Sequence, residues 1–142
     1  MFKKVEEAAL YIRSKISSIP SIAVVLGSGL GNFSSKLTHT VSIPYSDIPH
    51  FFSSSVEGHA NELIIGKVEN RKILCMNGRI HYYETGSMEK VIFPMRLLQI
   101  LGIRTIIFTN AAGGINKDFN PGDIVVVRDH INFQGTNPLI GK

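Results

Sequence analysis

The chain has 142 residues, of which 44% are hydrophobic and 18% are charged. This composition is typical of one globular domain over residues 1–142 with a single core, and it excludes a disordered chain. The formal net charge is +4, but Lys and Arg are scattered without a basic run, so the surplus fits a solvated surface, or a site for a small anion at least as well as nucleic acid.

Cysteine usage and the N-terminus bear on the compartment. Cys75 is the only cysteine, so an internal disulfide is excluded and a reducing compartment is favoured. It lies in an apolar run, where core packing is the expected role rather than catalysis. The N-terminal stretch MFKKVEEAAL has charges where a signal peptide needs its apolar segment, and no apolar run reaches the roughly eighteen residues of a membrane span. We therefore expect a cytoplasmic protein with no membrane partner.

The first part of the chain predicts a helix and then a buried strand. Apolar residues recur at spacings of four and three, which defines the core-facing stripe of an amphipathic helix: Val5, Ala9, Ile12, Ile16 and Ile19. Pro20 is expected to end this helix. Residues 22–26, IAVVL, are apolar without polar alternation, which is typical of a strand covered on both faces.

A hairpin and a second helix are predicted next. Residues 63–68 and 72–77 have the apolar, β-branched composition of two strands joined by a short turn. A helix is expected over 88–101, with Ser87 as its N-cap and Gly102 as its C-terminal stop.

Two further strands are predicted over 103–109 and 123–127, the second one entered through a turn that contains Pro121 and Gly122. Strands, helices and a hairpin alternate without an internal repeat or linker. The sequence therefore predicts an α/β domain with a largely buried mixed sheet.

Unusual residues follow three of the predicted strands, over 27–31, 78–84 and 110–114. Ligand sites of open α/β sheets form beyond the strand ends, so these three segments are expected to converge on one crevice.

The glycine-rich segment Gly27-Ser-Gly-Leu-Gly31 does not match either common nucleotide motif. The dinucleotide fingerprint fails because position 32 is Asn, and the later stretch GTNPLIGK has the wrong length for a P-loop and lacks the hydroxyl after its lysine. Glycines still let the backbone approach a ligand, and Ser28 offers a hydroxyl. The pattern alone leaves two interpretations open, a plain strand-to-helix turn and a cradle for an anion.

The stretch GRIHYYE, residues 78–84, has the most specific composition. If strand geometry persists, Arg79, His81 and Tyr83 project from one face. A guanidinium matches phosphate oxygens, an imidazole adds a donor, and a phenol could bind a sugar hydroxyl beside the anion. An exposed edge strand would tolerate the same residues. The third segment, TNAAGG, has only small side chains after Asn110, which suits an ordinary turn or a backbone that faces a flat ligand.

Taken together, these pieces resemble the trimeric, low-molecular-mass class of purine nucleoside phosphorylases. The matching stretches occur in family order and cover most of the chain from Ile22 onward: VVLGSGLGNF, IPHF with VEGHANEL, MNGRIHYYETG, TNAAGGIN and GDIVVVRDHINFQGTNPLIG. The methylthioadenosine phosphorylases, a sister group, share part of these motifs. The resemblance implies a mixed sheet distorted toward a barrel and flanked by helices, usually assembled as a homotrimer.

The resemblance also implies an activity and a set of site residues. Family members use inorganic phosphate to cleave the N-glycosidic bond of a purine nucleoside, and no metal or organic cofactor is implied. The residues that would bind phosphate are Ser28, Arg79, His81, the backbone of Ala111, and His59 beside them. The catalytic group would be Arg79, His81 and His59. Those that would contact the ribose or border the base are Tyr83, Asn110, Ala111, Ala112 and Gly113.

Family chains continue well beyond NPLIG, so the resemblance implies that residues 1–142 form the N-terminal part of the domain, truncated on its C-terminal side. Three explanations remain open. The chain is a truncated phosphorylase, one half of a split enzyme that a complementary C-terminal polypeptide completes, or a non-catalytic module that binds phosphate or a partner. Its expected ligands are phosphate and a purine nucleoside, not nucleic acid.

Overall fold

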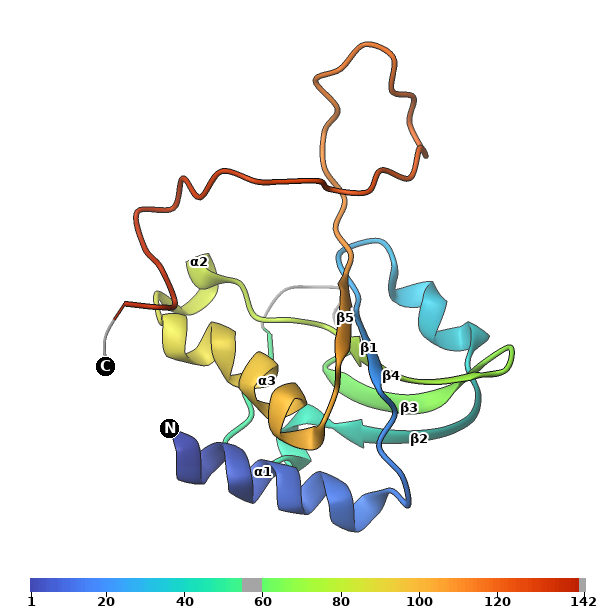
Figure 1. Cartoon of the computed structure of the whole chain (residues 1–142), viewed down its shortest axis with the longest axis vertical. Helices are drawn as coiled ribbons and strands as arrows, with labels where there is room; N and C mark the ends of the chain where they lie inside the picture. The colour runs from blue at the N-terminus through green and yellow to red at the C-terminus, as the bar shows by residue number, and fades with distance from the viewer. Residues whose placement is uncertain (55–59, 141–142) are drawn as a thin grey trace.

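Five strands form one mixed sheet in the order β2–β3–β4–β1–β5. The structure, a computed structural model, describes residues 1–54 and 60–140 (Figure 1). The helical elements are α1 (Phe2–Lys15), η1 (Gly31–Lys36), η2 (Tyr45–Asp47), α2 (Tyr82–Thr85) and α3 (Met88–Leu101). The strands are β1 (Ile22–Val25), β2 (Thr38–Pro44), β3 (Glu62–Val68), β4 (Arg71–Asn77) and β5 (Thr105–Phe108). This arrangement confirms the predicted α/β class with a mixed sheet flanked by helices.

Strand direction decides where the loops gather. Strand β1 pairs in parallel with β4 on one side and with β5 on the other, while β2, β3 and β4 form an antiparallel meander. Because β4, β1 and β5 run in the same direction, their carboxyl ends lie at one edge of the sheet. The three segments that the sequence analysis singled out all leave from this edge.

The core follows from the alternation of side chains along the strands. Residues of one parity face α1 and α3, which pack side by side on the same face of the sheet (Figure 1). Leu63 and Leu74 of this set are completely buried, together with Ile12 of α1. Residues of the other parity, such as Val24 and Cys75, form a smaller cluster with η1. Successive side chains of a strand point to opposite faces of the sheet, so the continuous apolar runs of β1, β3 and β4 contribute to the core on both faces.

The first helix is shorter than the apolar stripe predicted. It ends at Lys15, and Ile16 has extended backbone angles of φ −133 and ψ 139. Two serines follow, and Pro20 disfavours helical geometry at Ile19, so the helix has no support beyond its last turn. Ile16 and Ile19 are nevertheless partly buried against the core, so the apolar spacing identified positions that contact the core but overestimated the length of the helix.

Two strand predictions need correction. Strand β2 was missed because only Ile43 of its seven residues is buried, which leaves no clear alternation. The strand predicted over 123–127 was wrong: these residues are described, but they belong to no strand. Their side chains are in solvent, with Ile124 98% and Val126 89% exposed, and an apolar run becomes a strand only where a neighbouring strand pairs with it.

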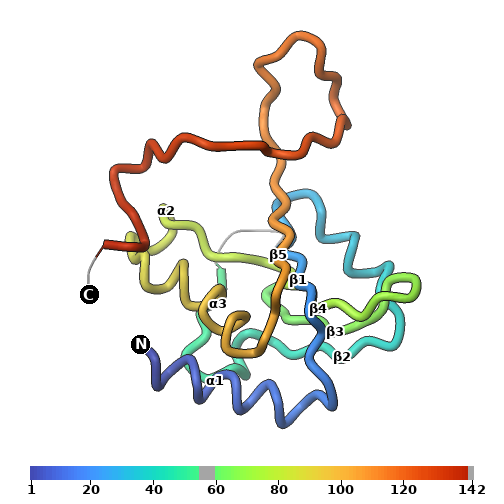
Figure 2. Tube along the Cα trace, viewed as in Figure 1, coloured from blue at the N-terminus to red at the C-terminus, as the bar shows by residue number. Residues whose placement is uncertain are grey.

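The residues after Thr109 leave the sheet and form no helix or strand up to Ile140. Beyond β5 the chain rises away from the sheet, makes a loop and returns toward α2 and the start of α3 (Figure 2). Almost every residue along it is exposed. In the part of the chain that the structure describes, no helix has both the length and the apolar character needed to cross a membrane.

Candidate functional site

Arg79, His81 and Glu84 are joined by hydrogen bonds just after β4. Arg79 Nε donates to His81 Nε2 at 3.3 Å, and His81 Nδ1 lies 2.9 Å from Glu84 Oε1. If His81 Nε2 accepts from arginine, the ring proton is on Nδ1 and is donated to the carboxylate, because a neutral imidazole has one donor and one acceptor. The network thus fixes both the orientation and the tautomer of the ring.

Glu84 is held in place from several sides. Only 4% of its side chain is exposed, compared with 23% for His81. Besides the imidazole, Glu84 Oε1 accepts the His81 backbone N–H at 2.7 Å, and Glu84 Oε2 accepts the Ser54 hydroxyl at 2.8 Å. Ser54 and Asn61 are in turn joined by two reciprocal amide hydrogen bonds of 2.8 and 2.9 Å. The carboxylate is therefore a buried, satisfied acceptor rather than a surface charge.

Arg79 also connects β4 with the end of β5. Its Nη1 donates to the backbone carbonyl of Thr109 at 2.8 Å. Thr109 in turn contacts the glycine loop, residues 27–31, because its hydroxyl accepts the Gly27 N–H at 3.0 Å. The guanidinium, the imidazole and the start of the glycine loop are consequently neighbours at one edge of the sheet.

The strand geometry expected for GRIHYYE does not persist. Strand β4 ends at Asn77, and Gly78 has a φ of 126. His81 is extended, with φ −100 and ψ 152, and residues 82–85 then form the single turn α2, so strand parity does not place Tyr83 on one face with Arg79 and His81. The helical turn instead stacks the Tyr83 ring on the His81 ring, with centroids 5.1 Å apart and planes 17° apart. Tyr83 remains 76% exposed, which leaves its phenol accessible from solvent.

The other residues that the resemblance implies lie farther along the loops. Ser28 is exposed, directly after the buried Gly27. Asn110 follows Thr109, and residues 110–113 are exposed in the segment that leaves the sheet. His59 lies outside the described residues. The structure therefore brings Arg79, His81 and Tyr83 together beside the glycine loop and leaves the small residues after Asn110 in solvent.

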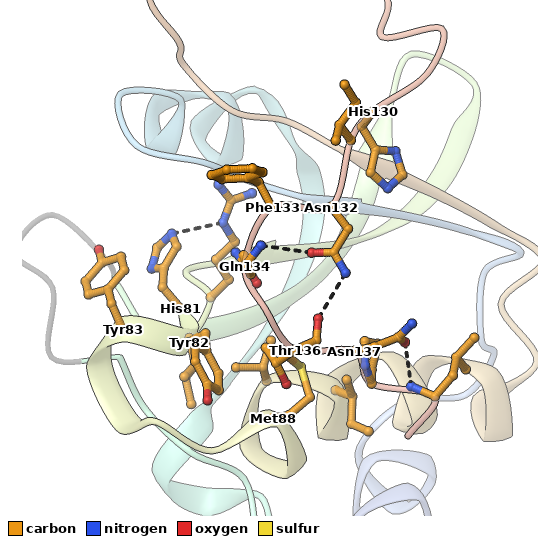
Figure 3. Close-up of a pocket in the computed structure, with 17 residues that line it drawn as sticks. His81, Tyr82, Tyr83, Met88, His130, Asn132, Phe133, Gln134, Thr136 and Asn137 are labelled. Atoms are coloured by element: carbon orange, nitrogen blue, oxygen red, sulfur yellow. Dashed lines mark hydrogen bonds between the residues drawn. The ribbon is translucent and has the colours of Figure 1, made fainter. Parts of the chain in front are cut away.

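An open pocket of about 960 Å³ borders this cluster. One side consists of residues from 79–92 and the other of residues from 130–139. Figure 3 shows His81, Tyr82 and Tyr83 beside Asn132, Phe133 and Gln134 of the returning segment. Asn132 is bound within that segment, since it donates to the Thr136 carbonyl at 2.9 Å and accepts the Gln134 N–H at 3.1 Å. The pocket is large enough for a ligand of nucleoside size.

A buried tyrosine fixes the residue that precedes Arg79. Tyr45 is 1% exposed, and its hydroxyl donates to the Gly78 carbonyl at 2.8 Å. Burial raises the pKa of Tyr45 well above its ordinary value, so the phenol remains a donor. Gly78 has φ 126, a backbone conformation that favours glycine, and this turn directs Arg79 toward Thr109.

The charges of this cluster suit an anion better than a cation. Arg79 is a permanent cation, and its guanidinium presents N–H donors that match an oxyanion. Among the described residues, no group of three or more His, Cys, Asp or Glu side chains comes together as a metal site would require.

Comparison with known proteins identifies the family. A family model described as "Phosphorylase superfamily" matches residues 21–142. The chain belongs to the phosphorylase superfamily. It is 48% identical over 141 residues to purine nucleoside phosphorylase 1 of Bacillus subtilis and 44% identical over 143 residues to the rat (Rattus norvegicus) purine nucleoside phosphorylase, in each case over 99% of this chain.

A solved structure supports the same assignment. Isoform 2 of the Schistosoma mansoni purine nucleoside phosphorylase, in complex with cytosine and ribose 1-phosphate, superposes with a TM-score of 0.89 at 39% identity over 99% of this chain. The chain covers 52% of the Bacillus protein, 50% of the rat protein and 50% of the Schistosoma chain. It therefore spans about half the length of the phosphorylases that it matches.

The sequence analysis predicts no role for two residues that contact Arg79 or His81, namely Glu84 and Thr109. Glu84 had a detectable signal, because it follows His81 by three residues, the spacing at which a glutamate reaches back to the start of a helix. Thr109 had no detectable sequence signal, since its contacts depend on the pairing of β1 with β5.

Proposed function

We propose that this chain carries the phosphate and ribose half-site of a purine nucleoside phosphorylase, which uses phosphate to release a purine base and forms ribose 1-phosphate. One observation carries the proposal: Arg79 Nε and His81 Nε2 lie 3.3 Å apart beside the glycine loop. The relatives of the chain are named purine nucleoside phosphorylases. The names of these relatives favour this activity over that of the methylthioadenosine phosphorylases.

Each residue has a specific task in this proposal. Arg79 and His81 bind the anion, and Ser28, His59 and the Ala111 backbone complete its hydrogen bonds. Tyr83 contacts the ribose, and residues 110–113 border the base and the sugar. Glu84 holds His81 in orientation beside Arg79. Nε2 binds the anion as a donor, which requires a proton on that nitrogen in the complex.

The chemistry requires an anion beneath the sugar. As the base leaves, positive charge develops on the ribose ring, as it does in glycoside hydrolysis. Bound phosphate stabilises this charge and then forms the new bond to the anomeric carbon, while the electrons of the glycosidic bond leave with the base. Fixing the anion in place removes much of the entropic cost of the encounter, which is worth up to about 7–11 kcal/mol in ideal geometry. Phosphate is thus a co-substrate, and the proposal includes no metal or organic cofactor.

Titration calorimetry with inorganic phosphate tests the half-site. The 142-residue chain should bind phosphate, and Arg79→Ala should abolish the binding. Arg71→Ala is the matched control, because Arg71 is an exposed arginine at the start of β4 and should leave the affinity unchanged. Equal affinity in the wild-type chain and in Arg79→Ala would contradict the proposal.

We also propose that the half-site works with a polypeptide that supplies the half of the phosphorylase fold not spanned by these residues. Such a partner would cover exposed apolar side chains on β5 and beyond, for example Phe108, which is 58% exposed, and Ile124. The homotrimer of the family and a cytoplasmic location belong to the same proposal, and the buried free thiol of Cys75 is consistent with a reducing compartment.

Reconstitution tests the complete activity. Mixing this chain with a polypeptide equivalent to the other half of the phosphorylase fold should produce phosphate-dependent release of hypoxanthine from inosine. Physical association without release of base would contradict the catalytic proposal and leave a phosphate-binding module. Strong binding to nucleic acid that weakens steeply with salt and ignores phosphate would contradict both.

A further inference from the structure

Three loops meet at the side chain and backbone of Thr109, a residue to which no role has been assigned. Its hydroxyl donates to the Val25 carbonyl at 3.0 Å and accepts the Gly27 N–H at 3.0 Å. Its own N–H also donates to the Val25 carbonyl at 3.0 Å, and its carbonyl accepts Arg79 Nη1 at 2.8 Å. Every polar group of this residue is used, and each bond leads to a different part of the site or to the strand that supports it.

These bonds reach across long distances in sequence. The Gly27 contact spans 82 residues and the Arg79 contact spans 30. One bond joins the last strand to the glycine loop, and the other joins it to the loop that carries His81. Pairing between β1 and β5 sets the two backbones side by side, but it does not determine how Arg79 is oriented.

Close packing at Gly27 makes this junction rigid. A Cβ atom at position 27 would lie 2.4 Å from the Thr109 carbonyl oxygen and 2.9 Å from the Asn110 Cα. Those distances are too short for any side chain, so the glycine loop can contact Thr109 only through its bare backbone. Gly27 is buried, and its N–H therefore needs the acceptor that the threonine hydroxyl supplies.

We infer that Thr109 is the positioning residue of the anion site: it sets the plane of the Arg79 guanidinium and the position of the glycine loop relative to one another. This inference rests on the proposed function, since it assumes that the loops enclose phosphate. Thr109 does not itself contact the anion. It holds two of the three anion-binding segments at a fixed separation and is the residue from which the third, Asn110 onward, departs.

The alternative is that Thr109 only completes the end of β5. Valine has the same shape and a similar preference for strands, so it would preserve that structural role while it removes both hydroxyl bonds. Serine would restore the hydroxyl and remove only a methyl group. These two substitutions therefore separate positioning from strand formation.

Phosphate titration of four variants beside the wild-type chain provides the test. Thr109→Val should weaken phosphate binding by about tenfold relative to the wild-type chain, because two hydrogen bonds that organise the site are lost, and Thr109→Ser should restore most of the affinity. Thr105→Val is the matched control at the other, exposed end of β5 and should bind like the wild-type chain. Gly27→Ala should repeat the loss from the opposite side of the contact.

A drop in melting temperature with unchanged phosphate affinity in Thr109→Val would overturn the inference.

If the wild-type chain fails to bind phosphate, the proposed function fails, and the inference is then tested on the protein without phosphate. The NMR signal of the Gly27 amide should shift in Thr109→Val and return in Thr109→Ser, because that amide loses and regains its hydroxyl acceptor, whereas Arg79 bonds a backbone carbonyl that all these chains keep. If Thr109→Val does not fold, hydrogen exchange at the Gly27 amide of the wild-type chain decides, and exchange that phosphate does not slow would overturn the inference.

Discussion

Glu84 determines what the His81 ring can do. The carboxylate accepts two bonds from His81, one from the ring and one from the backbone, and a third from Ser54. Glu84→Gln keeps the size of the side chain but places an NH₂ group where one carboxylate oxygen accepts a hydrogen bond. We expect phosphate affinity to fall by roughly tenfold, since charge-assisted bonds are stronger than neutral ones.

Calorimetry on Glu84→Gln checks this expectation, with Glu89→Gln as the control because Glu89 is an exposed glutamate in the first turn of α3. If both variants bind phosphate as tightly as the wild-type chain, Glu84 does not position His81.

Cys75 should be chemically inert while the chain is folded. It is completely buried in β4, and burial raises the pKa of its thiol to about 12. At neutral pH the reactive thiolate is thus roughly a thousandfold rarer than at the ordinary value of 9.0. A chromogenic disulfide reagent should label the protein only after denaturant unfolds it. Rapid labelling under native conditions would show that β4 is exposed.

The roles of single residues were predictable to different degrees. The sequence predicts Arg79 and His81 as site residues because their chemistry is unusual after a predicted strand, and the structure places them in hydrogen-bonding contact. It predicts Tyr83 from strand geometry that the chain does not have, because a helical turn begins at Tyr82. It does not predict a role for Thr109, since a threonine at a strand end has no distinctive signal and its contacts are tertiary.

At the scale of elements, a pH-sensitive contact joins α1 to the loop before β3. Glu7 Oε2 lies 2.6 Å from His50 Nε2. This hydrogen bond with His50 is the main reason why the pKa of Glu7 is lowered from its ordinary value of 4.5. A lowered folded-state pKa stabilises the fold above the unfolded value, and the contribution is lost as the pH falls through the folded value.

Thermal melting between pH 7 and pH 3 measures this contribution. The wild-type chain should lose stability below about pH 4.5, and Glu7→Gln should lose less over that interval. Glu6→Gln is the control, because Glu6 is the adjacent exposed glutamate of α1. Parallel pH profiles for Glu7→Gln and the wild-type chain would show that the contact does not contribute.

Most elements were predictable from local signals, and the exceptions have physical causes. Helix α3 runs over Met88–Leu101 as predicted and ends at Gly102, whose φ of 94 requires a glycine-like conformation. Strand β1 and the β3–β4 hairpin were also predicted, because they are buried on both faces. The run over 123–127 has the same composition but no neighbouring strand, and only tertiary structure could decide its conformation.

At the scale of the whole molecule, the distribution of apolar surface is uneven. The core beneath α1 and α3 is closed, whereas β5 and the segment after it expose many large apolar side chains, among them Ile107, Ile115, Ile124, Val126, Ile131, Phe133 and Leu139. Apolar surface of this extent promotes association. We expect the isolated chain to self-associate, as judged by sedimentation velocity.

Charged substitutions in the exposed segment should reverse this behaviour. Ile124→Lys combined with Val126→Lys should shift the chain toward monomer without lowering the melting temperature, since both side chains are almost fully exposed. Gln99→Lys adds a charge on the exposed face of α3 and should have little effect. A wild-type chain that sediments as a sharp monomer would contradict this expectation.

In the proposed site, a guanidinium and an imidazole bind one phosphate at the carboxyl end of the parallel strands. The most direct measurement is a phosphate titration followed by NMR of the Arg79 Nε–H and the His81 ring. We predict that both sets of signals shift together along one saturation curve, because the 3.3 Å contact between these side chains must open to admit the anion. Signals that stay unchanged at saturating phosphate, or that shift with different affinities, would contradict the claim.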